Sequence, residues 1–273
     1  MSRLPLNLRL GALLSAALLL AAALSLLWTP WPPYAIDIAA QLQPPSRSHW
    51  LGTDKLGRDI ASLLLAGAQV SVLVGLIAVG IGLVLGAALG LWAAARRGWV
   101  EEAIMRAADL GFAFPAILSA LLFTAVFGPG ITIAIAAIGL HAVPTFARVA
   151  RASALQVWSR DYCLAAQACG QGRLAITWRH VLPNIAAALI VQATIQFALA
   201  ILAEAALSYL GLGTQPPQAS WGRMLADAQT LLFSAPRLAV FPGLAIVAAV
   251  LGLNLLGDGL RDWTDPRRAR GRP

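Results

Sequence analysis

The chain has 273 residues, of which 59% are hydrophobic and only 12% are charged. Ordinary soluble domains carry about twice that share of charge, which excludes a wholly soluble globular protein. The formal net charge of +8 comes from arginines and a single lysine, Lys55. These residues do not cluster with interleaved aromatic side chains, so a nucleic-acid-binding domain is not expected.

The first apolar run extends from Leu10 to about Trp28, after a short basic start. A secretory signal peptide has a similar pattern. The run is long enough to cross a bilayer, however, and no clear small-residue cleavage site follows it. We therefore expect residues 1–30 to form an uncleaved N-terminal transmembrane helix. Cleavage would leave five spans.

The second uncharged run covers the 36 residues from Ile60 to Ala95. As one helix it would measure about 54 Å, against a hydrocarbon core of about 30 Å. We therefore expect residues 31–69 to form an extracytoplasmic segment that ends in an interfacial helix, with the second span over 70–94. Asp59 suits the N-terminus of that helix, so the motif GTDKLGRD favours a helix cap over a binding-protein contact.

The second span carries Gly82, Gly86 and Gly90, four residues apart on one face. Such spacing lets another helix approach closely. The pattern fits internal packing and subunit pairing equally well.

Four further spans follow. The uncharged run from Leu110 to Ala147 is interrupted by FGPG at 127–130, which predicts two spans joined by a tight turn. Runs over 181–203 and 238–257 complete the set. Residues 70–260 would thus form a core of five spans, followed by a cytoplasmic tail at 261–273.

Basic residues predict the orientation of the six spans. If the N-terminus is inside, the outer segments hold five of the 20 basic residues: Arg47, Lys55, Arg58, Arg223 and Arg237. The other 15 lie in inner segments, as the positive-inside rule requires. Both termini and the loop at 148–184 are therefore expected to be cytoplasmic.

The cytoplasmic loop at 148–184 is structured and half apolar. Ser159 is placed to cap a first short helix, which Gly170 would end. A second short helix over 173–182 would be followed by Pro183. On that helix one apolar face would hold Leu174, Trp178 and Val181.

Small residues on the first helix of this loop would let another backbone approach, most closely at Ala165 and Ala166. The cysteines Cys163 and Cys169 are expected to be reduced thiols, because their spacing suits neither zinc nor a disulfide. Together these features favour a docking element for a cytosolic partner over an ordinary loop.

The segment DYCLAAQACGQGRLAITWRHVLP at 161–183 resembles the "EAA" loop of membrane subunits of binding-protein-dependent ABC importers. That loop has E-A-A, three residues, Gly, nine residues and an apolar-x-Leu-Pro ending. Here Leu164 stands where Glu is usual, which puts one polar contact to the ATPase in doubt. His180 stands where an apolar residue is usual.

Further segments look like the C-type permease of dipeptide, oligopeptide and nickel importers. They include HWLGTDKLGRDIASLLLAGAQVSVLVG, MRAADLGFAFPAIL, AEAALSYLGLGTQPPQASWGRML and FPGLAIVAAVLGLNLLGDGLRDWTDP. The resemblance covers the chain from about Pro44 to Pro266.

The resemblance implies an all-α polytopic membrane protein with six transmembrane helices of the type I ABC importer permease fold, in a bacterial inner membrane. It implies four kinds of partner: a B-type permease in a heterodimer, two ATP-binding subunits, an extracytoplasmic solute-binding protein and the lipid bilayer. It also implies ATPase-coupling contacts at Asp161, Tyr162, Leu164, Ala165, Ala166, Gly170, Trp178, Arg179, His180, Leu182 and Pro183. Dipeptide, oligopeptide, nickel-chelate and glutathione systems share the pattern, and peptides are the expected solutes.

No Walker A sequence is present, so the chain is not expected to be an enzyme. ATP and Mg are expected on the partner subunits, with no cofactor or metal bound by this chain. His49 and His141 lack neighbours spaced for a metal site or a catalytic triad.

Charged residues near the span ends allow further predictions. Glu204 either lines the translocation path or is a hydrogen-bond partner within the outer loop, which we favour. Support of the cytoplasmic loop is predicted for Glu102, Arg106, Asp109 and Asp258. The rival function is an ion-gradient-driven secondary transporter, which usually shows inverted repeats and ionisable groups at the midplane. Neither is evident in this sequence.

Overall fold

The computed structural model describes residues 5–264, so the ends of the chain at 1–4 and 265–273, including most of the expected cytoplasmic tail, lie outside it. The helices are α1 (Leu6–Leu27), α2 (Ile60–Arg96), α3 (Gly98–Ala113), α4 (Ala116–Phe127), α5 (Ile131–Trp158), α6 (Asp161–Ala168), α7 (Arg173–Ile176), α8 (Leu182–Tyr209), α9 (Trp221–Ala228) and α10 (Arg237–Thr264). Short 3-10 turns lie at Ile38–Ala40 and Gln229–Leu231, and a π-helical turn lies at Thr177–Val181.

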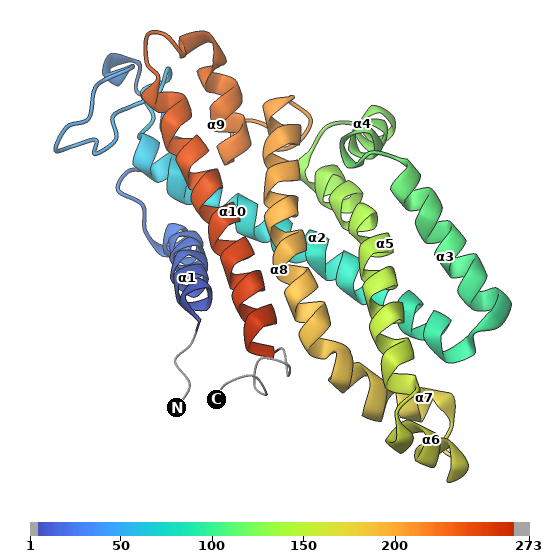
Figure 1. Ribbon diagram of the computed structural model, residues 1–273. Helices are drawn as coiled ribbons and strands as arrows, with labels where there is room; N and C mark the ends of the chain where they lie inside the picture. Colours follow the sequence, from blue (N-terminus) through green and yellow to red (C-terminus); the bar gives the residue numbers. More distant parts are fainter. Residues whose placement is uncertain (1–4, 265–273) are drawn as a thin grey trace.

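The long helices form one layered bundle with two distinct ends (Figure 1). The α6 end carries the start of α1, the short helices α6 and α7, and the end of α10. The α9 end carries residues 28–59, α9 and the turn between α4 and α5. The predicted coupling loop and the segments formed by residues 28–59 and by α9 therefore lie at opposite ends of the bundle.

Within residues 5–264, five helices are each long and apolar enough to cross a membrane: α1, α2, α5, α10 and the continuous stretch Arg173–Tyr209. The pair α3 and α4 makes a sixth span if it is counted as one, although the two helices meet at 86°. This bend is a feature that the sequence reading missed. It occurs at Phe114, which is extended because the following Pro115 disfavours a helical conformation. The predicted FGPG turn is confirmed, with Gly128 at φ +87°.

The separate interfacial helix expected before residue 70 is absent from the structure. Ile60–Arg96 is one continuous helix of 37 residues, about 56 Å long. Residues 60–69 and 70–94 therefore belong to the same helix, with no break between the two expected segments. In Figure 1, α2 crosses obliquely behind α10 and α8.

The glycine face of α2 packs inside this chain, against α5. A Cβ atom on Gly86 would lie 2.5 Å from the carbonyl oxygen of Val143, and one on Gly90 would lie 2.3 Å from that of Ala147. Gly82 meets the side chain of Ala142 in the same way. Of the two interpretations, the structure therefore supports internal packing.

The first helix is joined to α10 by a similar close contact. A Cβ atom on Gly11 would lie 2.2 Å from the backbone nitrogen of Leu256, and one on Gly259 would lie 2.5 Å from the Cα of Leu8. The backbones of α1 and α10 are therefore in direct contact. Removing α1 would expose this contact on α10.

Candidate functional site

The predicted coupling loop forms a helix, a sharp turn and a second helical segment at the α6 end (Figure 1). Helix α6 ends at Ala168, and Gly170 has a φ of +76°, a conformation that glycine adopts freely and β-branched residues resist. The backbone N–H of Gln171 donates to the carbonyl of Ala166 at 3.1 Å and closes the turn. The predicted helix end at Gly170 is confirmed.

Two details of this loop differ from the expectation. The hydroxyl of Ser159 donates to the carbonyl of Gln156 at 2.9 Å, so it completes α5 and does not cap α6. The second helix also does not end before Pro183. It continues through the π-helical turn into α8, in which Pro183 is the second residue.

The π-helical turn also changes which side chains share a face. It contains one residue more per turn than an α-helix, so the i, i+4, i+7 prediction does not hold. Leu174 and Trp178 are exposed, whereas Val181 is fully buried. Val181 joins a core cluster with Trp158 and Ile176, and this cluster fixes the loop against the end of the bundle.

Most of the residues predicted to contact the ATPase are exposed on the surface of this chain. The exposed ones are Asp161, Tyr162, Leu164, Ala165, Gly170, Trp178, Arg179 and Pro183, and His180 and Leu182 are half-buried. Ala166 is the exception, because it packs inward beside Cys163 in the core cluster. Only Ala165 of the pair is therefore open to another backbone. Cys163 and Cys169 are free thiols, and burial raises the pKa of the Cys163 thiol.

A contact that the sequence did not indicate fastens the coupling loop to α2. The guanidinium of Arg173 donates to the carbonyl of Ala95 at 2.8 Å and to that of Arg96 at 3.4 Å. These are among the last carbonyls of α2, where a helix lacks internal donors and favours a cation. The loop is thereby joined directly to the helix that extends to the α9 end.

The carboxylates of α3 form ion pairs of two kinds. Glu102 and Arg106 pair within α3, with a shortest N–O distance of 2.6 Å and both side chains exposed. Asp109 pairs with Arg148 of α5. Glu101, at the same inner end of the third span, accepts from Nε of Arg151 at 2.6 Å and also links α3 to α5.

These ion pairs place Asp109 and Glu101 where they hold the helix that leads into α6. Asp258 belongs to α10, a helix that lies apart from α6 in Figure 1, and it has no ion-pair partner within residues 5–264. No contact supports a role for Asp258 in bracing the loop.

Glu204 is sealed within the protein near the α9 end of α8. Its side chain is 0% exposed. One carboxylate oxygen accepts from the hydroxyls of Ser208 at 2.6 Å and Thr214 at 3.0 Å. Ser208 in turn accepts from the backbone N–H of Thr214 at 2.8 Å. The carboxylate thus holds the loop after α8, which favours its structural interpretation over a position lining the path.

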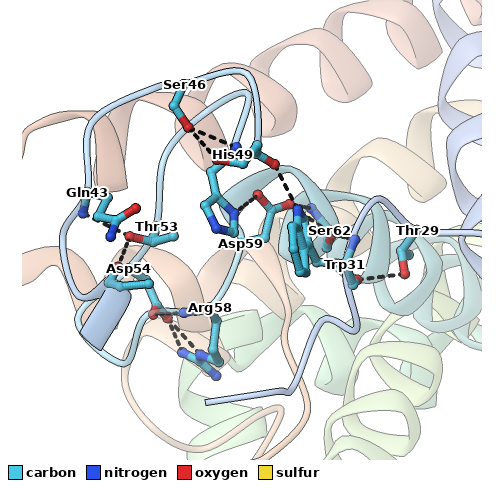
Figure 2. A network of polar contacts seen from close by, with 12 residues as sticks. Thr29, Trp31, Gln43, Ser46, His49, Thr53, Asp54, Arg58, Asp59 and Ser62 are labelled. Carbon is cyan, nitrogen blue, oxygen red and sulfur yellow. Dashed lines mark hydrogen bonds and ion pairs between the residues drawn. The ribbon is translucent and has the colours of Figure 1, made fainter. Parts of the chain in front are cut away.

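A second polar network organises residues 29–62 at the α9 end (Figure 2). The Asp59 carboxylate accepts from the backbone N–H and the hydroxyl of Ser62, both at 2.8 Å, which confirms the predicted cap of α2. Its other oxygen lies 3.0 Å from Nδ1 of His49, whose ring packs against Trp31. His49, which the sequence left isolated, is therefore part of the cap.

Ion pairs connect this network to the loop around α9. Asp54 accepts from the backbone N–H of Arg58 at 2.9 Å and pairs with its guanidinium at 2.6 Å. Asp227 of α9 pairs with Lys55 at 3.0 Å and with Arg223 at 3.4 Å. These contacts make the α9 end a continuous ordered surface built from two distant parts of the sequence.

Residues 82–270 match the family model described as "binding-protein-dependent transport system inner membrane component". The chain belongs to this family. It is a multi-pass inner-membrane permease, and permeases of this kind work with a partner permease, an ATPase and a solute-binding protein.

Relatives of this permease include three transport proteins. The glutathione transport system permease protein GsiD of Pectobacterium atrosepticum is 42% identical over 82% of this chain and 74% of its own. The dipeptide transport system permease protein DppC of Alkalihalophilus pseudofirmus is 44% identical over 83% and 75%. A putative peptide transport system permease protein of Brucella suis is 44% identical over 95% and 87%.

A solved structure shows the same fold. The permease matches a chain of the inward-facing MetNI methionine ABC transporter with a TM-score of 0.63, at 18% identity, over 74% of this chain and 97% of that one. The predicted type I importer permease fold is confirmed. The family also disfavours the rival interpretation as an ion-gradient-driven transporter, and ATP hydrolysis belongs to separate subunits.

Proposed function

We propose that this permease forms the translocation path of an ATP-driven peptide importer together with a B-type permease. Two ATP-binding subunits would drive the pair, and one of them would dock on the exposed side chains of α6 and of the π-helical turn. The observation that carries this proposal is the exposed helix and glycine turn at the α6 end, anchored to α2 and the core of the bundle.

Further features support the finer parts of the proposal. Dipeptide and glutathione relatives favour a short peptide as the solute. The ordered surface at the α9 end offers a platform for an extracytoplasmic solute-binding protein. The bias of basic residues supports a cytoplasmic position for the α6 end. We expect ATP and Mg on the ATP-binding subunits and no cofactor on this chain. A reporter after Pro273 should then be cytoplasmic, and one at Gln215 extracytoplasmic.

Copurification from the native membrane tests the proposal. The tagged permease should bring down an ATP-binding protein and a second permease, and the complex should hydrolyse ATP faster when a loaded binding protein is added. The permease alone should show no ATPase activity. Isolation of an active, ATPase-free transporter would contradict the proposal.

A further inference from the structure

A cavity of about 450 Å³ lies between α4, α5 and α8. Small-molecule sites in proteins usually measure roughly 300–1,000 Å³, so this cavity is large enough for a small solute. Its walls are mainly Ala, Leu and Ile. It lies beside the bend between α3 and α4, and transport proteins often place solute sites next to interrupted helices.

Three polar side chains line this cavity at the middle of the bundle: His141 and Thr145 of α5, and Gln196 of α8. His141 and Thr145 are four residues apart and so share a face of α5. All three are half-buried, and none makes a side-chain hydrogen bond to another described residue. Inside a membrane, polar groups without partners are expensive unless they face water or a solute. The cavity is therefore mainly apolar but holds three polar side chains without partners among the described residues.

The chemistry of the three side chains points to a neutral, hydrogen-bonding solute. A glutamine amide, a hydroxyl and an imidazole supply both donors and acceptors. None of the residues lining the cavity is Asp, Glu, Lys or Arg. Among residues 5–264 there is no group of three His, Cys, Asp or Glu that could hold a metal ion, so a bare divalent cation is a poor fit. Amide groups of a peptide match this lining, and the apolar walls would accept varied side chains.

A larger cavity of about 850 Å³ between α2 and α8 lacks these properties. Its lining is almost wholly apolar, and its one hydroxyl, on Thr194, already donates to the carbonyl of Val191 at 2.8 Å. Glu204 lies outside both cavities, and one of its carboxylate oxygens is bound by Ser208 and Thr214. Of the two cavities, only the smaller one is lined by polar side chains that lack a hydrogen-bond partner among the described residues.

We propose that a short peptide contacts the cavity between α4, α5 and α8 during transport, and that Gln196, His141 and Thr145 hydrogen-bond its amide groups. This inference rests on the proposed function, because it assigns solute contacts within the same translocation path. The residues proposed to contact the solute are therefore in the middle of α5 and α8, and Glu204 is not among them.

The test uses the assembled importer in proteoliposomes, with a defined mixture of dipeptides and glutathione as the solutes and mass spectrometry as the readout of uptake. Gln196→Ala should raise the apparent KM of uptake roughly tenfold, the effect of losing one or two hydrogen bonds to the solute. Thr145→Val should weaken uptake less, and Gln196→Asn should restore part of it. Stimulation of ATP hydrolysis by loaded binding protein should be retained in all three variants.

Thr194→Val is the matched control, since it removes a hydroxyl two residues from Gln196 but outside this cavity, and it should transport like wild type. Ala203→Phe fills the cavity without changing a polar group, and should abolish uptake while the subunits still copurify. Wild-type KM and uptake in Gln196→Ala and Ala203→Phe would overturn the inference and leave the proposed function standing. Loss of the partner permease from these variants would also overturn it, because the cavity would then be a subunit contact. No ATP-dependent peptide uptake by wild type would refute both.

Discussion

At the scale of single residues, the few buried carboxyl groups of this permease accept hydrogen bonds that hold a helix end, a turn and a loop in place. Asp59 caps α2, Asp54 closes the turn before it, and Glu204 ties down the loop after α8. Asp54 and Asp59 accept hydrogen bonds on both carboxylate oxygens, and Glu204 accepts two on one oxygen, which offsets part of the penalty of burying these groups. Carboxyl groups are rare in the chain, and at these three positions their hydrogen bonds hold the α9 end together.

Asp59→Ala should lower the free energy of unfolding by about 1–2 kcal/mol, because it removes the N-cap of α2 and the partner of His49. Chemical denaturation in detergent would measure the change. Asp37→Ala is the matched control, since Asp37 caps only an exposed 3-10 turn of three residues. Its effect should stay below about 0.5 kcal/mol. Equal effects of the two substitutions would show that the cap of α2 contributes little.

At the scale of elements, glycine determines both how the helices turn and how closely they pack. Gly170 and Gly128 have positive φ and open space where a Cβ would lie, so at both positions the backbone conformation alone requires glycine. On α2 the reason is the opposite: Gly86 has an ordinary helical conformation but no room for a Cβ. A substitution in the turn at Gly170 should therefore disturb the local backbone conformation, whereas one at Gly86 should disturb the packing between helices.

Gly170→Val should uncouple transport from ATP hydrolysis. A β-branched residue resists a φ of +76°, so the turn after α6 should rearrange and misplace the exposed docking side chains. The subunits should still assemble, with ATPase binding or its stimulation by loaded binding protein weakened at least tenfold. Gly128→Val imposes a similar strain at the opposite end, with φ +87°, and should leave coupling intact. Normal transport by Gly170→Val would remove the docking role assigned to α6.

Gly86→Ala should destabilise the contact between α2 and α5. The added methyl group would lie 2.5 Å from the carbonyl oxygen of Val143, and overpacking of this kind typically lowers stability by about 1–3 kcal/mol. Gly80→Ala, on the same helix with nothing within 4 Å, should be neutral or slightly stabilising. Thermal unfolding of the two purified variants compares them directly. A melting temperature of Gly86→Ala equal to that of Gly80→Ala would argue against the tight packing of these helices.

At the scale of the whole molecule, the sequence predicted the features that lipid and local backbone chemistry impose. Lipid demands long apolar runs, so the spans were evident, and FGPG marked a turn because glycine flanks proline. Phe114–Pro115 was missed because a proline inside a span is often tolerated without a sharp bend. The continuity of α2 was missed because the expected break near residue 70 rested on the length of the run alone, and no helix-breaking residue marks such a break. Contacts such as that of Arg173 with Ala95, or of His49 with Asp59, could not be predicted either, because no local sequence pattern indicates which residues meet in the fold.

The central claim is that this fold transmits ATP-driven motion from the α6 end to a solute path. Dipeptide uptake into proteoliposomes tests it most directly, with the assembled importer, loaded binding protein and either ATP or an imposed ion gradient as the energy source. We predict uptake that requires ATP hydrolysis and the binding protein, and that persists when ionophores collapse every ion gradient. Uptake that follows the ion gradient and proceeds without ATP would contradict the account.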